Sequence, residues 1–299
     1  MEPILTMLSS IAQGLIWGVM VLGLYITFRF LDFADLTVDG SFALGGSVSA
    51  ILISKNINPL LSLLIAALAG IIAGCITGCL HVKLKIPSIL SGILVMTALY
   101  SIDIRIMGRA NTSLLGKKTV FTSINELFKH LGSSSQIIST ITLGLLTCAI
   151  MVLFLYWFFE TEIGYAIRAT VDNKNMACAL GINIGIMQIV ALALSNGLIA
   201  FSGALVAQNQ GYADINMGIG TLVCGLASIT IGEAFMKKSF NFVVKLIFIV
   251  LGSVLYRIII SVALQIGMNP SDLKLFTAII VAATLVLPKI LKQKGGAKC

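Results

Sequence analysis

Two long apolar segments without a charged residue constrain this chain more than any other feature of its sequence. Leu60–Leu80 and Ile137–Phe159 contain no Asp, Glu, Lys or Arg. At about 1.5 Å per residue, each is long enough as a helix to cross the roughly 30 Å hydrocarbon core of a bilayer. Within lipid the backbone must satisfy its own hydrogen bonds, and continuous rather than alternating apolar residues favour helices over a barrel. With 58% hydrophobic and 11% charged residues in 299 positions, the sequence predicts an all-α, polytopic transmembrane helical bundle.

About nine segments are candidate spans, and some of them are short or broken. The second, fourth and seventh are shorter than about 17 residues, and short, glycine-interrupted segments are typical of helices that line a transport pathway. No hydrophilic stretch is long enough to form a separate domain, so residues 1–299 are predicted to be one transmembrane domain. The nine segments are Leu8–Phe28, Ser41–Ser54, Pro59–Leu80, Pro87–Ile102, Ile137–Phe159, Ile184–Gln208, Ile219–Gly232, Phe242–Leu264 and Leu273–Pro288.

The basic residues between these spans predict the orientation of the chain in the membrane. Short cytoplasmic loops carry an excess of Lys and Arg, whereas long loops weigh less in this rule. If the loop 160–183 is cytoplasmic, alternation puts the loop 103–136 on the extracytoplasmic side, the N-terminus outside and the C-terminus in the cytoplasm. Lys55 and Lys274 then remain as the basic residues of the short outer loops. Those on the inner side are Arg29, Lys83, Lys85, Arg168, Lys174, Lys237, Lys238, Lys289, Lys292, Lys294 and Lys298.

Motifs of catalysis and nucleotide binding are missing. The run Gly116-Lys117-Lys118-Thr119 lacks the first glycine and the Gly-Lys-Ser/Thr order of a phosphate-binding loop. His81 and His130 have no partner at metal-ligand spacing. The sequence therefore predicts a chain that is not an enzyme and holds no metal or cofactor. The net charge of +8 lies mostly in short loops between spans, which is a pattern of membrane orientation rather than of nucleic-acid binding.

Polar residues close to or within the spans are candidates for a translocation pathway. The segment Asp32–Ser41 carries three carboxylates between two apolar stretches, and ionisable groups near the membrane are costly unless they are wetted or paired. The alternative is a solvated turn with Asp39-Gly40 as its tight corner. Asn196 lies in the middle of a span, where a polar side chain usually faces a neighbour or a cavity. The pathway candidates are Asp39, Ser41, Thr97, Asn196 and Gln208.

The loop 160–183 is predicted to form two short helices. Thr161 can cap the first helix, Asp172 or Asn173 can cap the second, and Gly181 can supply the left-handed residue that ends it. Four residues give the second helix a small apolar surface: Met176, Ala177, Ala179 and Leu180. This surface fits either a soluble protein partner or the lipid surface.

Three segments in order resemble permeases of ATP-binding-cassette importers of the branched-chain amino acid and ribose type. They are Gly164-Tyr-Ala-Ile-Arg168-Ala followed by Leu180-Gly-Ile-Asn183, the stretch Phe33–Ser41, and the basic loop Lys83-Leu-Lys-Ile-Pro87. Together they cover most of the chain between about residues 14 and 288. The Asp39-Gly40 pair departs from the Gly-Ser of the sugar-type members, which favours an amino acid, aromatic or branched-chain, as the solute.

The resemblance implies a permease of a bacterial-type plasma (inner) membrane that imports a small solute by alternating access. Its partners would be a cytoplasmic ATP-binding-cassette ATPase, an extracytoplasmic solute-binding protein and a second permease copy. It also implies that the second helix of the loop 160–183 docks on the ATPase rather than on lipid. By matching position, the coupling residues would be Arg168, Asp172, Asn175, Ala177 and Gly181.

A stand-alone secondary transporter driven by an ion gradient is the alternative. Such a protein needs an ionisable residue in the middle of the membrane to carry the coupling ion. The sequence offers only Asn196 and hydroxyl groups at that depth, which argues against the alternative.

Overall fold

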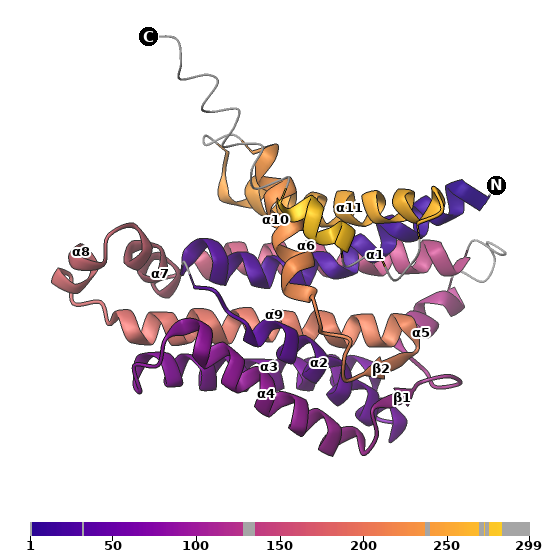
Figure 1. The fold of residues 1–299 in the computed structure, drawn as a ribbon, viewed down its shortest axis with the longest axis horizontal. Coiled ribbons are helices and arrows are strands. Elements are labelled where there is room, and N and C mark those ends of the chain that lie inside the picture. Colours follow the sequence, from indigo (N-terminus) through magenta and orange to yellow (C-terminus); the bar gives the residue numbers. More distant parts are fainter. Residues whose placement is uncertain are drawn as a thin grey trace, which may run out of the picture.

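Helices account for nearly all of the computed structural model, which describes residues 2–31, 33–127, 135–236, 240–268, 272 and 275–282 (Figure 1). A short antiparallel pair of strands is added at one end, with Asn111 opposite Asp214. In chain order the elements are α1 (Glu2–Tyr25), the π-helical turn η1 (Ile26–Phe30), α2 (Thr37–Ser54), α3 (Pro59–Val82), α4 (Ser88–Met107), β1 (Asn111–Ser113), α5 (Val120–Leu127), α6 (Ser135–Phe159), α7 (Glu162–Asp172), α8 (Lys174–Ala179), α9 (Ile184–Gln210), β2 (Tyr212–Asp214), α10 (Thr221–Ala234) and α11 (Phe242–Gln265).

The described residues contain seven helices that are long and apolar enough to cross a membrane: α1 with η1, α2, α3, α4, α6, α9 and α11. The predicted multi-pass helical bundle is therefore confirmed. α10, with 14 residues, is about 21 Å long and is too short to span the hydrocarbon core alone. Of the predicted ninth span, Leu273–Pro288, the structure describes residues 275–282, which are helical.

Two of the three segments predicted to be short are in fact full-length helices. α2 has 18 residues and α4 has 20. The prediction began the second span after Asp39 and Gly40 and ended the fourth span before Asp103, as if both carboxylates faced water. Asp103 is only 1% exposed and Asp39 binds another part of the chain, so both helices continue through them. Within the loop 103–136 the structure likewise places the last turn of α4, β1, α5 and the start of α6.

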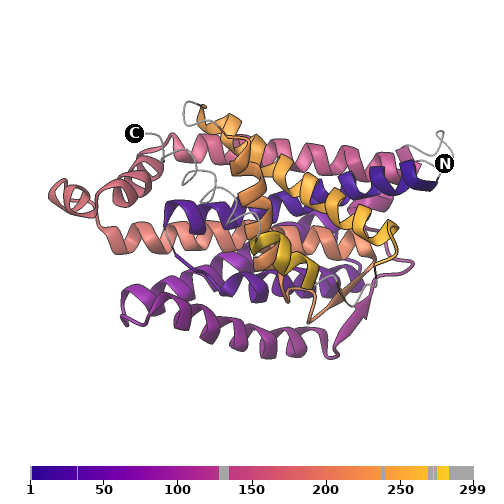
Figure 2. The same cartoon turned by 45° about the horizontal axis from the view of Figure 1, so that its top comes forward.

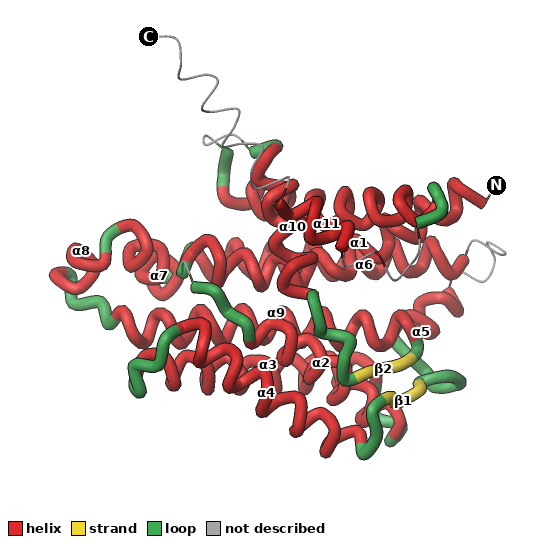
Figure 3. Tube along the Cα trace, in the orientation of Figure 1, coloured by secondary structure: helices red, strands yellow, loops and turns green. Residues whose placement is uncertain are grey.

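The long helices from α1 to α9 run in alternating directions between two ends of the bundle, and α11 runs in the same direction as α9, with the short α10 between them (Figures 1 and 2). The β1–β2 end, on the right in Figure 1, holds the N-terminus, both strands and α5. The α7–α8 end, on the left, holds those two short helices. Two irregular segments run along the bundle rather than across its ends (Figure 3). They connect η1 to α2 and β2 to α10.

α9 is the central helix of the bundle, because it packs most extensively on α3 and α2 and also on α1. Glycines allow this close packing. A side chain at Gly45 would collide with the backbone of Ala200, and one at Gly203 would collide with the backbone of Phe42. Small residues at such contacts are how helices associate in a membrane, where lipid is as apolar as leucine and burial alone gives little driving force.

Replacing Gly45 with leucine is expected to destabilise the bundle by about 1–3 kcal/mol. The new side chain would collide with Ala200, and α2 and α9 cannot separate without losing their other contacts. The thermal unfolding midpoint of the purified protein in detergent measures this effect. Ala149→Leu is the matched control, because Ala149 is exposed on the outer face of α6. Equal unfolding midpoints for the two variants would show that the α2–α9 contact is not as tight as the structure indicates.

Candidate functional site

The residues 33–36 that lead into α2 lie inside the bundle and are not helical. Asp35 is buried, with 1% of its surface exposed. Its carboxyl accepts hydrogen bonds from the Asn196 Nδ2 at 2.8 Å and from the backbone N–H of Thr37 at 2.9 Å. Asn196 is the thirteenth of 27 residues in α9, so this carboxyl lies near the middle of a helix about 40 Å long. Non-helical backbone is tolerated at such depth only where protein surrounds it or where it lines a cavity.

Further polar contacts tie this segment to its neighbours. The Ser41 hydroxyl donates to the Asn196 Oδ1 at 2.6 Å, and the Thr37 and Thr77 hydroxyls are 2.9 Å apart. These bonds connect α2, α3 and α9 around one buried asparagine. The structure thus places Ser41 and Asn196 together inside the helix packing, with protein groups as their partners.

Asp39 lies in the first turn of α2 and binds the start of α10. Its carboxyl accepts hydrogen bonds from the Gly220 N–H at 3.0 Å, the Thr221 hydroxyl at 2.7 Å and the Leu222 N–H at 2.9 Å. Gly220 has a φ of 88°, a conformation that glycine adopts without strain. The solvated Asp39-Gly40 turn that the sequence left open is therefore wrong, since both residues are helical. The carboxylate instead satisfies N–H groups at the positive end of a helix that begins inside the bundle.

Replacing Asp39 with alanine is expected to cost about 1–2 kcal/mol, because the first N–H groups of α10 lose their acceptor. Hydrogen exchange of the peptide around residues 218–226, followed by mass spectrometry, should become faster. Asp39→Asn keeps one acceptor oxygen and should lie between the wild type and Asp39→Ala. Unchanged exchange in Asp39→Ala would contradict the capping role.

A cavity of about 390 Å³ opens beside this contact. It lies between α2, α4 and the segment that leads from β2 to α10. Thr97 is one of its lining residues, although the Thr97 hydroxyl also donates to the Ile93 carbonyl of its own helix at 3.0 Å. Of the five pathway candidates, the structure brings Asp39 and Thr97 together at this cavity. Its lining residues are Asp39, Gly40, Ala43, Met96, Thr97, Tyr100, Asp103, Ile215, Asn216 and Ile219.

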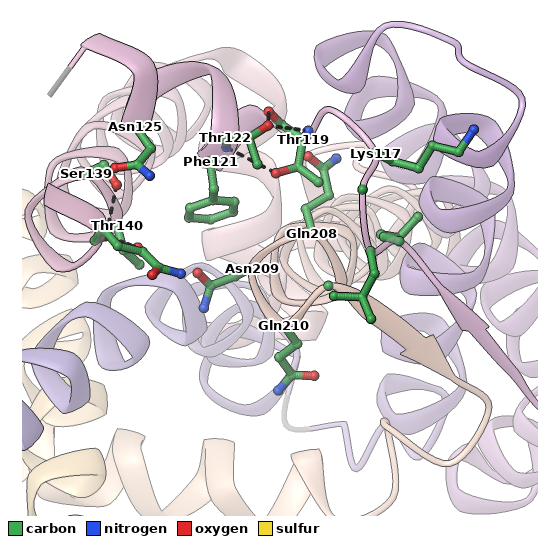
Figure 4. Close-up of a pocket in the computed structure, with 15 residues that line it drawn as sticks. Lys117, Thr119, Phe121, Thr122, Asn125, Ser139, Thr140, Gln208, Asn209 and Gln210 are labelled. Atoms are coloured by element: carbon green, nitrogen blue, oxygen red, sulfur yellow. Dashed lines mark hydrogen bonds between the residues drawn. The ribbon is translucent and has the colours of Figure 1, made fainter. Parts of the chain in front are cut away.

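Gln208 lies at the β1–β2 end of α9, where its amide forms hydrogen bonds to α2, α3 and the start of α5. Its Nε2 donates to the Ser49 and Ser62 hydroxyls, each at 3.1 Å, and its Oε1 accepts from the Val120 N–H at 3.0 Å. It also borders a polar cavity of about 250 Å³ between α5, α6 and the end of α9. Figure 4 shows Gln208, Asn209 and Thr119 around this cavity.

Ionisable residues occur inside the described bundle, which corrects the sequence-based argument that none lies at mid-membrane depth. Asp35 contacts the middle of α9, and Asp103 lies within α4. Arg257, within α11, places its guanidinium 3.9 Å from the centre of the Trp17 ring. The argument failed because Asp35 was assigned to a surface loop and Asp103 to the residue after the end of a span. The depth of Asp35 is known only from the structure, in which the chain after η1 turns back into the bundle and Asp35 contacts Asn196.

The loop 160–183 forms the two predicted helices, α7 and α8, with the predicted local caps. The Thr161 hydroxyl accepts from the Gly164 N–H at 3.4 Å, and the Asn173 Oδ1 accepts from the Met176 N–H at 3.0 Å. Gly181 has a φ of 79°. Of the two residues that could cap α8, Asn173 does so; the side chain of Asp172 lies outside the described part of the structure.

The exposed surface of α8 is smaller than predicted. Met176 is 60% exposed and Leu180, just after the helix, is 65% exposed. Asn175 and Gly181 are exposed beside them. Ala177 is buried to 1%, so its assignment to the exposed apolar surface is wrong. The turn that follows α8 folds back on this helix, where the Ile182 N–H donates to the Ala177 carbonyl.

Arg168 connects α7 to the transmembrane helices. Its guanidinium carbon lies 4.4 Å from the centre of the Phe242 ring in α11 and 5.4 Å from that of Phe159 in α6. A guanidinium over aromatic faces is a cation–π contact, worth about 0.5–2 kcal/mol. The Arg168 side chain also borders a cavity of about 430 Å³ at the α7–α8 end, together with Arg29 and Lys245.

Comparisons with known proteins agree with this architecture. The model of the family described as the branched-chain amino acid transport system permease component matches residues 6–287. A tyrosine transport system permease protein of Clostridioides difficile is 45% identical over 278 residues, covering 93% of this chain and 90% of that protein. An uncharacterised protein of Rickettsia prowazekii is 34% identical over 282 residues, covering 93% of this chain and 96% of its own length.

A solved structure described as PsaBC from Streptococcus pneumoniae in complex with Fab shares the fold. The TM-score is 0.50 with 14% identity, covering 93% of this chain and 89% of that one. At this identity the likeness concerns the fold alone. The family match extends over nearly the whole chain and over every element described above except the first residues of α1. This multi-pass membrane protein therefore belongs to the family of branched-chain amino acid transport system permease components.

Proposed function

We propose that this chain is the permease subunit of an ATP-binding-cassette importer for an aromatic amino acid, with tyrosine as the first candidate. The single observation that carries the choice of solute is the 45% identity to a tyrosine transport system permease over 93% of this chain. The bundle geometry supports a transport pathway, because α2 and α10 are both preceded by an irregular segment and Asp39 near the start of α2 binds the start of α10. Interrupted helices whose N-termini face the interior are typical of solute sites in transporters.

In this proposal Asp39 and Thr97 line the pathway itself, since both border the cavity between α2 and α4. Ser41, Asn196 and Gln208 hold the helices around the pathway, because their polar atoms bind other elements of the bundle. The segments that lead into α2 and α10 are the natural hinges for alternating access. Neither segment is helical, so each can change its φ and ψ angles without breaking a helix.

The α7–α8 end is proposed to face the cytoplasm and to receive the ATPase, with the N-terminus outside. Met176 and Leu180 would insert into the ATPase as apolar anchors, flanked by Asp172, Asn175 and Gly181. Buried Ala177 would support the docking helix from beneath. Arg168 would transmit the movement of the ATPase, because it is in contact with both α6 and α11. A solute-binding protein would dock at the β1–β2 end, and a second permease copy would complete the transporter.

Leu180→Glu tests the docking surface. A carboxylate in an apolar contact should weaken the association with the ATPase at least about tenfold, since it would be buried without a partner. Co-purification and the dissociation constant of the permease–ATPase pair measure the effect. Leu115→Glu is the matched control, because Leu115 is 86% exposed at the opposite end of the bundle. Equal loss in both variants, or in neither, would contradict docking at α8.

Reconstitution in liposomes tests the function as a whole. Radiolabelled tyrosine should enter only when the ATPase, the solute-binding protein and ATP are all present. The structure also gives the ion-coupled transporter a basis, because Asp35 and Asp103 are carboxylates buried inside the bundle. Tyrosine uptake by this chain alone, driven by a proton or sodium gradient without ATPase, would overturn the importer proposal in favour of that second candidate.

A further inference from the structure

We propose that Asp103 binds the ammonium group of the transported amino acid within the cavity between α2 and α4. This inference rests on the proposed import of an amino acid and names the residue that would recognise its cationic group. Asp103 did not stand out in the sequence, because it lies just beyond the last apolar residue of its segment. In the structure, Asp103 lies within α4 and lines the 390 Å³ cavity.

The carboxyl of Asp103 is buried without a donor. The residue is 1% exposed, and neither carboxyl oxygen accepts a hydrogen bond from the part of the chain that the structure describes. The hydroxyl of Ser47, which is near enough to act on this carboxyl, donates instead to the Ala43 carbonyl at 2.8 Å. Buried carboxylates are normally paired or hydrogen-bonded, because an isolated one is strongly disfavoured. Asp103 lines the cavity, but both carboxyl oxygens are shielded from solvent, so a cationic ligand in the cavity would satisfy them once the side chain turns toward it.

The protein itself provides no cation for this role among the described residues. The cavity lining contains no Lys, Arg or His, and the described ion pair joins Arg29 and Glu233 at the other end of the bundle. The other carboxylate of the cavity, Asp39, is different, because it already accepts three hydrogen bonds from the start of α10. Asp103 is thus the acceptor that is left for a ligand.

The remaining walls fit an amino acid with a large apolar side chain. Met96, Ile215 and Ile219 supply apolar surface, and Tyr100, which is 47% exposed, adds an aromatic ring. Asn216 supplies a side-chain amide that can donate to a carboxylate. A cavity of about 390 Å³ lies within the range of sites for small organic ligands, which are largely apolar with a few polar groups that fix orientation.

Three related probes separate recognition of the ammonium group from binding of the aromatic ring. They are L-phenylalanine, phenethylamine, which lacks the carboxylate, and 3-phenylpropionate, which lacks the ammonium group. Saturation-transfer NMR on the full chain in nanodiscs, corrected with empty nanodiscs, detects weak binding of each probe. The wild type should bind L-phenylalanine and phenethylamine in competition with one another, and 3-phenylpropionate far more weakly.

Asp103→Asn should lower the affinity for the two ammonium probes at least about tenfold, since a charge-assisted hydrogen bond is lost. Glu126→Gln is the matched control, because Glu126 is exposed in α5 outside the cavity and should keep wild-type affinity. Thermal stability provides a second readout. Because Asp103 lacks a protein donor, Asp103→Asn should unfold at the wild-type temperature or above it, whereas a structural carboxylate would leave a less stable variant.

Several outcomes would overturn the inference. They are wild-type affinity in Asp103→Asn, equal binding of 3-phenylpropionate and phenethylamine to the wild type, no binding of any probe, or an unstable variant that loses all three probes alike. Displacement of phenethylamine by millimolar sodium chloride, but not by choline chloride, would also overturn it by showing an inorganic cation site. The proposed function would survive all of these, because it is tested separately in liposomes: it fails if ATP-driven tyrosine uptake is missing or if an ion gradient drives uptake without the ATPase.

Discussion

A helix that begins inside a bilayer leaves its first N–H groups without water to bind, and the arrangement of this bundle depends on how that problem is solved. The carboxyl of Asp39 meets the Gly220 and Leu222 N–H groups and the Thr221 hydroxyl at once. This contact joins residues 181 positions apart and lets α10 begin at depth. It also brings the chain leading to α10 against α2, where the cavity of Asp103 forms.

The segment before α2 has the same requirement: its polar groups lie inside the bundle and must find partners in the protein. Non-helical chain can lie at the depth of Asn196 only because Asp35 accepts from that amide and Thr37 shares a hydrogen bond with Thr77. Small residues make room for these contacts, since α2 and α9 approach so closely that Gly45 and Gly203 tolerate no side chain. Hydrogen bonds therefore hold these helices in position, and glycines let the helices approach closely enough for the bonds to form.

Local signals were readable from the sequence, and contacts between distant segments were not. The uncharged run Leu60–Leu80 predicted α3 almost to the residue, because length and apolarity alone decide a membrane span. Thr161 and Gly181 marked the limits of the helices in the loop 160–183, since caps depend on adjacent residues.

Tertiary contacts explain the failures of sequence reasoning. The partner of Asp39 lies in another part of the chain, so nothing near Asp39 distinguished a helix cap from a solvated turn. The sequence pattern placed Ala177 on an exposed surface, whereas the fold buries it. Asp103 resembled the first residue of an outer loop because its burial depends on helices that pack against α4.

The central claim is that the cavity between α2, α4 and the segment that leads to α10 belongs to a pathway that ATP opens to one side at a time. Labelling of Ile219→Cys by a membrane-impermeant thiol reagent tests this most directly, because Ile219 lines the cavity and is 60% exposed. The assay uses the complete importer in liposomes and mass spectrometry of the peptide that contains residue 219. The account predicts that the rate of labelling from outside changes strongly when the ATPase is trapped with a non-hydrolysable nucleotide. A rate that is the same with and without nucleotide would contradict it.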